Sequence, residues 1–263
     1  MQLAGKTVVV TGAAKGIGRE LVLAAARAGA ANVVAADIDG EGAKRVAREA
    51  GGIAWRVDVS QEAEIAALID ETETHIGPID LFCGNAGIIL RGGFETPDAD
   101  WERIWKINVM AHVWAARHLV PRMTARGGGH FLITASAAGL LSQVGSAPYA
   151  VTKHAAVAVA EWLGLTHGDA GIGVTLLCPQ AVRTDMTAGR ENGVASVNGM
   201  MEPADVAAAG IRAVEAGEFL VLPHPEVRTY MRRRADDTDR WIAGMRKLNA
   251  AYGQLKPGSQ KTN

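Results

Sequence analysis

Cysteine, aromatic side chains and an excess of either charge are scarce in this sequence of 263 residues. The 2 cysteines, Cys83 and Cys178, are too few for a disulfide framework or a thiolate zinc cage. Lysine and arginine together number 27 against 28 aspartates and glutamates, so no net field attracts nucleic acid or a membrane surface. We therefore expect a cytoplasmic protein that binds neither nucleic acid nor membrane.

Several sequence signatures are also missing. No run of about 18 apolar residues occurs, which argues against a transmembrane helix, and the segment after Met1 lacks the apolar core of a secretory signal. The 7 histidines occur without a His-Glu-x-x-His or Cys-x-x-Cys pattern, so we predict no metal site. A Gly-x-Ser-x-Gly nucleophile elbow is absent as well, which argues against a serine hydrolase.

Short apolar runs rich in β-branched residues alternate with longer helical patterns along the chain. The predicted strands are 6–11, 32–36, 53–57, 79–84, 130–135, 173–178 and 219–222. The predicted helices are 16–28, 40–50, 61–76, 98–126, 148–169 and 203–216. Strands that are apolar almost throughout and are separated by helices indicate a parallel sheet covered on both faces. The sequence therefore predicts a doubly wound α/β fold.

No internal repeat, low-complexity block or interior linker divides the chain, so we expect a single domain over 1–263. Within it we expect a substrate loop at about 185–203. A run of mixed charge around Arg232 indicates a solvated helical extension at about 225–252. The remaining tail, 253–263, has the composition of a frayed end.

A glycine-rich turn follows the first predicted strand directly. It reads Thr11-Gly12-Ala13-Ala14-Lys15-Gly16-Ile17-Gly18 and leads into a helix. Glycines permit a tight turn with positive φ, and the free N–H groups at the start of the helix attract a pyrophosphate. The Gly-Lys-Ser/Thr order of a triphosphate-binding loop is missing. The turn therefore predicts dinucleotide binding, with a purely structural strand-to-helix turn as the alternative.

Acidic residues follow the second and third predicted strands. Asp37 comes about 20 residues after the glycine turn, where a carboxylate accepts hydrogen bonds from the adenosine ribose and repels a 2′-phosphate. This favours NAD over NADP, although Lys15 near the same ribose weakens the rejection. Asp58 could accept a hydrogen bond from the adenine amino group. The alternatives are a helix cap for Asp37, for which Asp39 is better placed, and a turn residue for Asp58.

Ser136, Tyr149 and Lys153 form a candidate catalytic group. Ser136 follows the fifth predicted strand, and Tyr149 and Lys153 lie one helical turn apart on one face of the next helix. A phenol has a pKa of about 10, and an adjacent ammonium together with an oxidised nicotinamide would stabilise the phenolate for acid–base work. The Ser136 hydroxyl could bind the same substrate oxygen. Taken alone, the pair also fits an aromatic ring packed beneath the stem of a lysine.

Together these motifs resemble the classical short-chain dehydrogenase/reductase family over roughly residues 5–190. The motifs in the family's order are the glycine turn, Gly84-Asn85-Ala86-Gly87, Asn108, Ser136, Tyr149 and Lys153. The resemblance implies a Rossmann-like sheet of about seven strands and a catalytic tetrad. Ser136 would orient the substrate oxygen and Tyr149 would transfer the proton. Lys153 would bind the nicotinamide ribose and tune the tyrosine, while Asn108 would hold a water of the proton relay.

The motifs and the resemblance define one set of candidate cofactor contacts. These are Gly12, Lys15, Gly16, Ile17, Gly18, Asp37, Ile38, Asp58, Val59, Asn85, Ala86, Gly87, Tyr149, Lys153, Pro179, Val182 and Thr184. Two positions depart from the family pattern. Gly84 stands where the family has asparagine, which we expect to alter strand and helix support more than chemistry. Gln180 replaces the glycine after Pro179 and alters the loop beside the nicotinamide.

These residues predict an NAD-dependent oxidoreductase that transfers a hydride between nicotinamide and a secondary alcohol or ketone. The candidate substrate contacts are Ser136, Gln143 and Tyr149. The other expected pocket walls are apolar, which favours a neutral, moderately hydrophobic small molecule. They include Leu140, Leu141, Val144, Met186, Val194, Met200 and Met201. The alternatives are an NADP-dependent carbonyl reductase and a non-catalytic nicotinamide-binding sensor, against which the intact tetrad argues.

The helical patterns at 98–126 and 148–169 carry more apolar residues than one sheet-facing stripe requires. In the family that the chain resembles, these helices pair across a two-fold axis. We therefore expect a homodimer or homotetramer. The competing explanation is that residues 226–252 fold over these helices within one chain.

Overall fold

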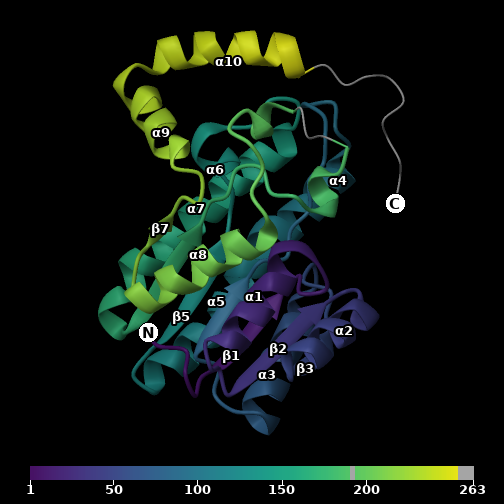
Figure 1. The fold of residues 1–263 in the computed structure, drawn as a ribbon, viewed down its shortest axis with the longest axis vertical. Coiled ribbons are helices and arrows are strands. Elements are labelled where there is room, and N and C mark those ends of the chain that lie inside the picture. Colours follow the sequence, from purple (N-terminus) through teal and green to yellow (C-terminus); the bar gives the residue numbers. More distant parts are fainter. Residues whose placement is uncertain (190–192, 254–263) are drawn as a thin grey trace.

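The computed structural model describes residues 1–189 and 193–253. The predicted tail from 254 onward and part of the predicted substrate loop, 190–192, lie outside the described residues. A parallel sheet forms the centre of the fold, with seven strands in the order β3-β2-β1-β4-β5-β6-β7 (Figure 1). The strands are β1 (Thr7–Thr11), β2 (Asn32–Asp37), β3 (Ile53–Arg56), β4 (Leu81–Gly84), β5 (Gly129–Thr134), β6 (Ile172–Leu177) and β7 (Leu220–Val221). The doubly wound, Rossmann-like prediction is confirmed.

Helices cover both faces of this sheet. They are α1 (Gly16–Arg27), α2 (Gly40–Ala50), α3 (Glu62–His75), α4 (Asp98–Trp105), α5 (Ala111–Ala125), α6 (Ala138–Leu141), α7 (Ala147–His167), α8 (Pro203–Ala216), α9 (Glu226–Asp236) and α10 (Thr238–Tyr252). Buried side chains of α1, α2 and α8 form one core, and those of α3, α5 and α7 form the other. The strand order reverses between β1 and β4, which opens a crevice at the carboxyl ends of the strands.

Strand β1 lies in the middle of the sheet and contributes side chains to both hydrophobic cores. All of its residues are buried. Val8 and Val10 pack into the core beneath α1, whereas Val9 packs into the opposite core. Successive side chains of a strand point to opposite faces, so a continuous apolar run fills both cores. Each fully buried valine contributes about 1.5–3 kcal/mol of transfer free energy.

The helix predicted as one element over 98–126 is interrupted. A π-helical segment, Lys106–Met110, separates α4 from α5. The buried Asn108 lies within it and hydrogen-bonds to the backbone of Ile88, outside its own helix. A π segment widens the helix and leaves backbone groups out of the regular α pattern, and such segments occur frequently at functional sites. Apolar periodicity alone does not reveal it, since the pattern continues through the insertion.

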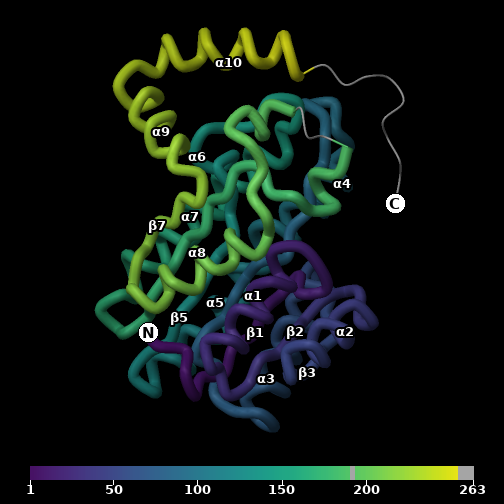
Figure 2. Tube along the Cα trace, in the orientation of Figure 1, coloured from purple at the N-terminus to yellow at the C-terminus, as the bar shows by residue number. Residues whose placement is uncertain are grey.

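The C-terminal helices form a separate layer at one end of the molecule. The trace runs from β7 through α9, beside α6, and then turns into α10, which crosses that end (Figure 2). The competing explanation for the apolar helices is therefore wrong, because α9 and α10 leave Trp162 and Leu165 of α7 exposed by 68% and 82%. Among the described residues, no helix has the length and apolar character that crossing a membrane requires.

Candidate active site

A cleft of about 1590 Å³ lies at the carboxyl ends of the strands and extends from the glycine turn to α10. Single small-ligand pockets measure roughly 300–1,000 Å³. The cleft therefore has room for a dinucleotide and a second molecule. Every predicted cofactor contact except Gly18 lines it.

The glycine turn is shaped by close backbone approaches. Gly12 and Gly16 have φ of 66° and 57°, in the left-handed region that favours glycine. A Cβ on Gly12 would lie 2.8 Å from the Ala86 Cα atom, and one on Gly18 would lie 1.9 Å from the Gly12 carbonyl oxygen. Gly18 does not line the cleft, and its missing side chain lets α1 pack against the turn. The Lys15 side chain does not cap α1, so the first N–H groups remain available for a pyrophosphate.

Polar side chains join the ends of β1 and β4 beside this turn. The Thr11 hydroxyl accepts hydrogen bonds from the backbone N–H groups of Asn85, at 3.1 Å, and Ala86, at 3.2 Å. The Asn85 side chain donates to the Thr11 carbonyl oxygen at 3.1 Å. These bonds hold 85–87 against the glycine turn.

Asp37 lines the cleft where the adenosine ribose is expected. One carboxylate oxygen accepts from the Ala14 N–H and the other from the Asp39 N–H, both at 2.9 Å. Asp39, as expected, is the N-cap of α2 and accepts from the Gly42 N–H. The Lys15 ammonium forms an exposed ion pair with Asp185 at 2.9 Å.

Asp58 also lines the cleft while serving as a turn residue. Its carboxylate accepts a hydrogen bond from the Ser60 N–H at 2.9 Å. Both interpretations of Asp58 that the sequence left open are therefore compatible with its position, since a carboxylate oxygen has further lone pairs for the adenine amino group.

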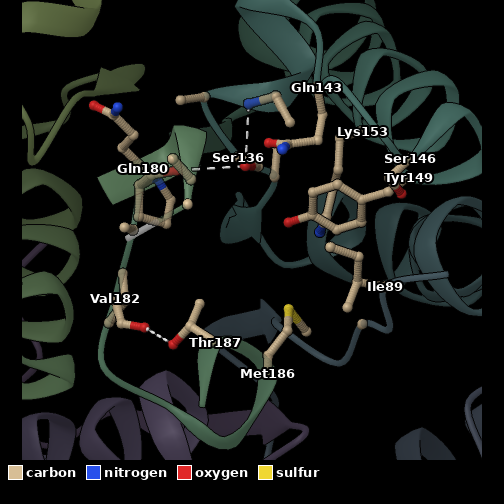
Figure 3. A pocket seen from close by; sticks show the side chains of 18 of the residues that line it. Ile89, Ser136, Gln143, Ser146, Tyr149, Lys153, Gln180, Val182, Met186 and Thr187 are labelled. Carbon is tan, nitrogen blue, oxygen red and sulfur yellow. Dashed lines mark hydrogen bonds between the residues drawn. The ribbon is translucent and has the colours of Figure 1, made fainter. Parts of the chain in front are cut away.

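Ser136, Tyr149 and Lys153 converge on one side of the cleft (Figure 3). The Ser136 hydroxyl oxygen accepts from the Ala138 N–H at 3.1 Å and donates to the Pro179 carbonyl at 3.4 Å. The Lys153 ammonium donates to the Thr134 carbonyl at 2.9 Å and lies 5.7 Å from the centre of the Tyr149 ring. Parallel strands and the start of α7 thus bring a hydroxyl, a phenol and an ammonium together.

Burial dominates the electrostatics of this group. Burial raises the pKa of Tyr149, and the neighbouring Ser136 hydroxyl offsets part of that increase. Burial lowers the pKa of Lys153 to about 8. Desolvation disfavours the charged form of each group. In the protein alone the ammonium does not make Tyr149 a stronger acid; the expected stabilisation of the phenolate also requires the oxidised nicotinamide.

Asn108 is buried and does not line the cleft. Its amide accepts from the Ile88 N–H at 2.9 Å and donates to the Ile88 carbonyl at 3.0 Å and the Thr152 hydroxyl at 3.1 Å. A Cβ on Gly87 would lie 3.3 Å from the Asn108 oxygen and 3.5 Å from the Lys153 nitrogen. The Asn108 side chain therefore supports the segment beside Lys153.

Gly84, the first departure from the family pattern, is explained by a buried histidine on α5. A Cβ on Gly84 would lie 2.6 Å from Nδ1 of His112. Burial lowers the pKa of His112 to about 3, with a further contribution from the Lys153 charge. Among the described residues, Nε2 of His112 has no hydrogen-bond partner. The missing side chain at 84 is what accommodates the neutral imidazole.

Gln180, the second departure, connects three segments around the cleft. Its side-chain nitrogen donates to the Asn198 side-chain oxygen at 3.2 Å, and the Tyr230 hydroxyl donates to the same oxygen at 3.2 Å. The Gln180 backbone N–H donates to Nδ1 of His224. The loop after β6, the segment around Asn198 and α9 are therefore joined by a polar network that the sequence did not predict.

The wall opposite the catalytic group is largely apolar. Met186 and Thr187 lie across the cavity from Ser136 and Tyr149 (Figure 3). The predicted wall residues that line the cleft are Leu141, Val144, Met186, Val194 and Met200, together with Gln143. Leu140 and Met201 were predicted incorrectly, because they pack against the hydrophobic core and not in the cleft.

Sequence reasoning missed the contribution of α9 and α10 to this cleft. Residues Tyr230, Arg233, Asp236, Asp237, Arg240, Trp241, Gly244, Met245, Leu248, Tyr252 and Gly253 line it. The recurrence of Trp241, Met245, Leu248 and Tyr252 at helical spacing was the available signal.

The chain belongs to the short chain dehydrogenase family, whose model matches residues 6–195. It is 35% identical to 1-deoxy-11-beta-hydroxypentalenate dehydrogenase from Streptomyces exfoliatus over 92% of each chain. A short chain dehydrogenase/reductase from Burkholderia phymatum in complex with NAD has TM-score 0.81 and 29% identity, covering 99% of this chain and 100% of that one. For 7 alpha-hydroxysteroid dehydrogenase complexed with NADH and 7-oxo glycochenodeoxycholic acid, the TM-score is 0.76 and the identity 28%, over 84% and 93%. The chain is thus an oxidoreductase whose relatives act on hydroxyl or keto groups.

Proposed function

We propose that the chain is an NAD-dependent dehydrogenase that interconverts a secondary alcohol and a ketone. The observation that carries the proposal is the convergence of Ser136, Tyr149 and Lys153 in a cleft that begins at an open helix N-terminus. A sensor that only bound the cofactor would have no chemical need for a buried hydroxyl and phenol facing the second half of the cleft.

NAD fits the turn and the ribose end of the cleft. The Gly12 and Gly16 backbone and the first N–H groups of α1 would hold the pyrophosphate, and the Asp37 carboxylate would accept from the ribose hydroxyls. The exposed ion pair with Asp185 offsets part of the Lys15 charge that would attract a 2′-phosphate. These features favour NAD over NADP.

When bound, the oxidised nicotinamide would supply the hydride acceptor for the alcohol carbon. Tyr149 accepts the alcohol proton at its phenolic oxygen, and the Ser136 hydroxyl donates a hydrogen bond to the substrate oxygen. Lys153 would hold the nicotinamide ribose and, as an ammonium, would stabilise the deprotonated Tyr149. Asn108 fixes the segment beside Lys153 and supports the water of the proton relay. In the reductive direction Tyr149 returns the proton.

The substrate we propose is a neutral, moderately hydrophobic alcohol or ketone. The apolar walls around Leu141, Val144 and Met186 support this, with Gln143 as a polar contact. Relatives named for hydroxypentalenate and hydroxysteroid substrates support the hydrophobic character of the substrate, while the carboxylates of hydroxypentalenate and of 7-oxo glycochenodeoxycholic acid give no support for its neutrality.

The test is turnover by the purified full-length chain. Reduced-nicotinamide absorbance is followed with NAD and separately with NADP, across aliphatic, monocyclic and polycyclic secondary alcohols. We expect turnover with NAD and at least one cyclic alcohol. Tight NAD binding without turnover of any alcohol, or of the matching ketones with NADH, would instead support the sensor.

We further propose a cytoplasmic homodimer or homotetramer. The exposed Trp162 and Leu165 on α7 supply an apolar surface for a two-fold interface, and the buried, unpaired Cys83 and Cys178 suit a reducing compartment. Light scattering at micromolar concentration checks the assembly. A mass near 27.6 kDa would contradict it.

A further inference from the structure

Helix α10 carries an apolar stripe that lines the cleft, and within this stripe Trp241 also packs against a small hydrophobic cluster. Trp241, Met245, Leu248 and Tyr252 recur every three to four positions, and all line the cleft. None of the residues of α10 is buried. An amphipathic helix normally packs its apolar stripe against a core. This stripe instead faces the same space as Ser136 and Tyr149.

Outside the stripe, α10 carries the exposed polar residues Arg246, Lys247 and Asn249 and one exposed apolar residue, Ile242. Lys247 lines neither this cleft nor a smaller neighbouring hollow, which Trp241 and Met245 also line and which Ile242, Arg246 and Asn249 border. The helix is therefore oriented with its apolar side toward the cleft. The cleft-facing stripe also contains Gly244, around which a Cβ would meet no atom within 4 Å. This glycine leaves a recess in the middle of the apolar surface.

Contacts at both ends hold α10 across the cleft. At its first turn Trp241 packs in a hydrophobic cluster with Val227 of α9 and Leu141 of α6. At its far end Gly253 approaches the segment before α7, because a Cβ on Gly145 would lie 3.5 Å from the Gly253 carbonyl oxygen. Figure 1 shows α10 crossing beyond α6. The middle of the helix thus borders the outer part of the cleft whose inner part holds the catalytic group.

We propose that the apolar stripe of α10 is the outer wall of the substrate site and selects large apolar alcohols and ketones. The inference rests on the proposed function for the position of the reacting carbon near Tyr149. A rigid polycyclic molecule whose hydroxyl reaches Tyr149 would extend outward between the Val144 side of the cleft and Leu248. A monocyclic alcohol would stay at the inner end and leave the stripe untouched.

Charged groups mark where this wall ends. Arg233, Asp236, Asp237 and Arg240 line the cleft at the junction of α9 and α10. Positive and negative side chains are both present, so this corner does not favour a substrate of one particular charge. The selective contact is therefore the apolar stripe, and a neutral polycyclic molecule is the suitable probe.

The decisive experiment compares Leu248→Gln with Lys247→Gln, which place the same uncharged side chain at neighbouring positions about 100° apart around α10, one inside the cleft-lining stripe and one outside it. Binding of androsterone, a neutral hydroxysteroid, is measured by quenching of tryptophan fluorescence, with and without NAD. We expect Leu248→Gln to weaken binding about tenfold, since loss of a buried leucine contact is worth at least that factor. Lys247→Gln is expected to bind as the wild type does.

A steric variant gives an independent measurement. Gly244→Phe fills the recess, so it should lower kcat/KM for androsterone about tenfold or more while changing kcat/KM for cyclohexanol and the Kd of NAD less than twofold. Circular dichroism of each variant checks that the helices are intact.

Three results would overturn the proposal: wild-type protein that does not bind androsterone, Leu248→Gln that binds it undiminished, or Lys247→Gln that loses binding equally. Failure of the proposed function gives a different result. In that case androsterone would bind and depend on Leu248, but neither alcohol would be oxidised with NAD.

Discussion

The two ends of the cleft are built in different ways. The cofactor end consists of strand termini and a glycine turn, fixed by backbone contacts such as the approach of Gly18 to the Gly12 carbonyl. The outer end consists of short 3₁₀ turns, including Asp185–Thr187 and Val194–Ser196, and of α10, which buries no side chain. The proposed catalytic residues are thus held by the core of the fold, whereas the proposed substrate wall lies on exposed segments.

This difference has a thermodynamic basis. A substitution at the cofactor end disturbs close-packed backbone, and such disturbance typically costs 1–3 kcal/mol of unfolding free energy. A substitution on an exposed helix usually changes that free energy by less than about 0.5 kcal/mol. The outer wall can therefore vary in sequence without loss of the fold.

The largest effect is expected at the inner end of the cleft. Tyr149→Phe removes the proton-transferring hydroxyl and keeps the buried ring, so kcat should fall by about 10²- to 10⁴-fold. The Kd of NAD, measured by fluorescence, should change little. A variant that retains a tenth of wild-type turnover would contradict the role of Tyr149.

Gly18→Ala and Gly244→Ala place the same methyl group at the two ends of the cleft. The first should lower the unfolding free energy by about 1–3 kcal/mol, because its Cβ collides with the Gly12 carbonyl. The second should raise it by up to about 1 kcal/mol, since Gly244 lies mid-helix in open space. Urea unfolding monitored by circular dichroism measures both changes. Equal effects would remove the contrast between the two ends.

Acid should destabilise the core through His112. Its folded-state pKa of about 3 lies below the ordinary value of 6.5, so between these limits only the unfolded chain binds the proton. The unfolding free energy therefore falls as the pH drops below 6.5. At pH 5 this contribution is about 2 kcal/mol. His112→Gln should show a shallower decline in urea unfolding between pH 7 and 5, and an unchanged decline would mean that His112 does not contribute.

Cofactor selectivity should respond to Asp37. Asp37→Ala removes the ribose acceptor and the repulsion of a 2′-phosphate, so the ratio of kcat/KM for NAD to that for NADP should fall about tenfold. Asp58→Ala is the matched control, because its carboxylate lies at the adenine end and should leave the ratio almost unchanged. A wild-type chain that uses NADP as well as NAD would contradict the cofactor assignment.

The features of the fold that follow from a local sequence pattern were predicted correctly. The apolar run of β1 and the glycine turn predicted the parallel sheet and the position of the cleft. The turn spacing of Tyr149 and Lys153 predicted that they share a helix face. These features depend on the spacing of residues along the chain, which can be read from the sequence directly.

Features that depend on contacts between distant segments were not predictable in this way. The π-helical segment around Asn108 requires hydrogen bonds to Ile88 and Thr152, from two other parts of the chain. The mixed charges near Arg232 indicated a solvated helix but not that the following stripe of α10 faces the cleft. Likewise, nothing in the sequence connects Gly84 with His112.

The close approach of Gly84 and His112 restricts the order in which these two positions can mutate. Restoring the family's asparagine at position 84 would drive a side chain into the buried imidazole, whereas first replacing His112 by a smaller residue would open the space. Gly84→Asn is therefore expected to be harmful in the present background and tolerated after His112→Ala. The double variant can therefore be reached through a stable single variant only when the substitution at position 112 comes first.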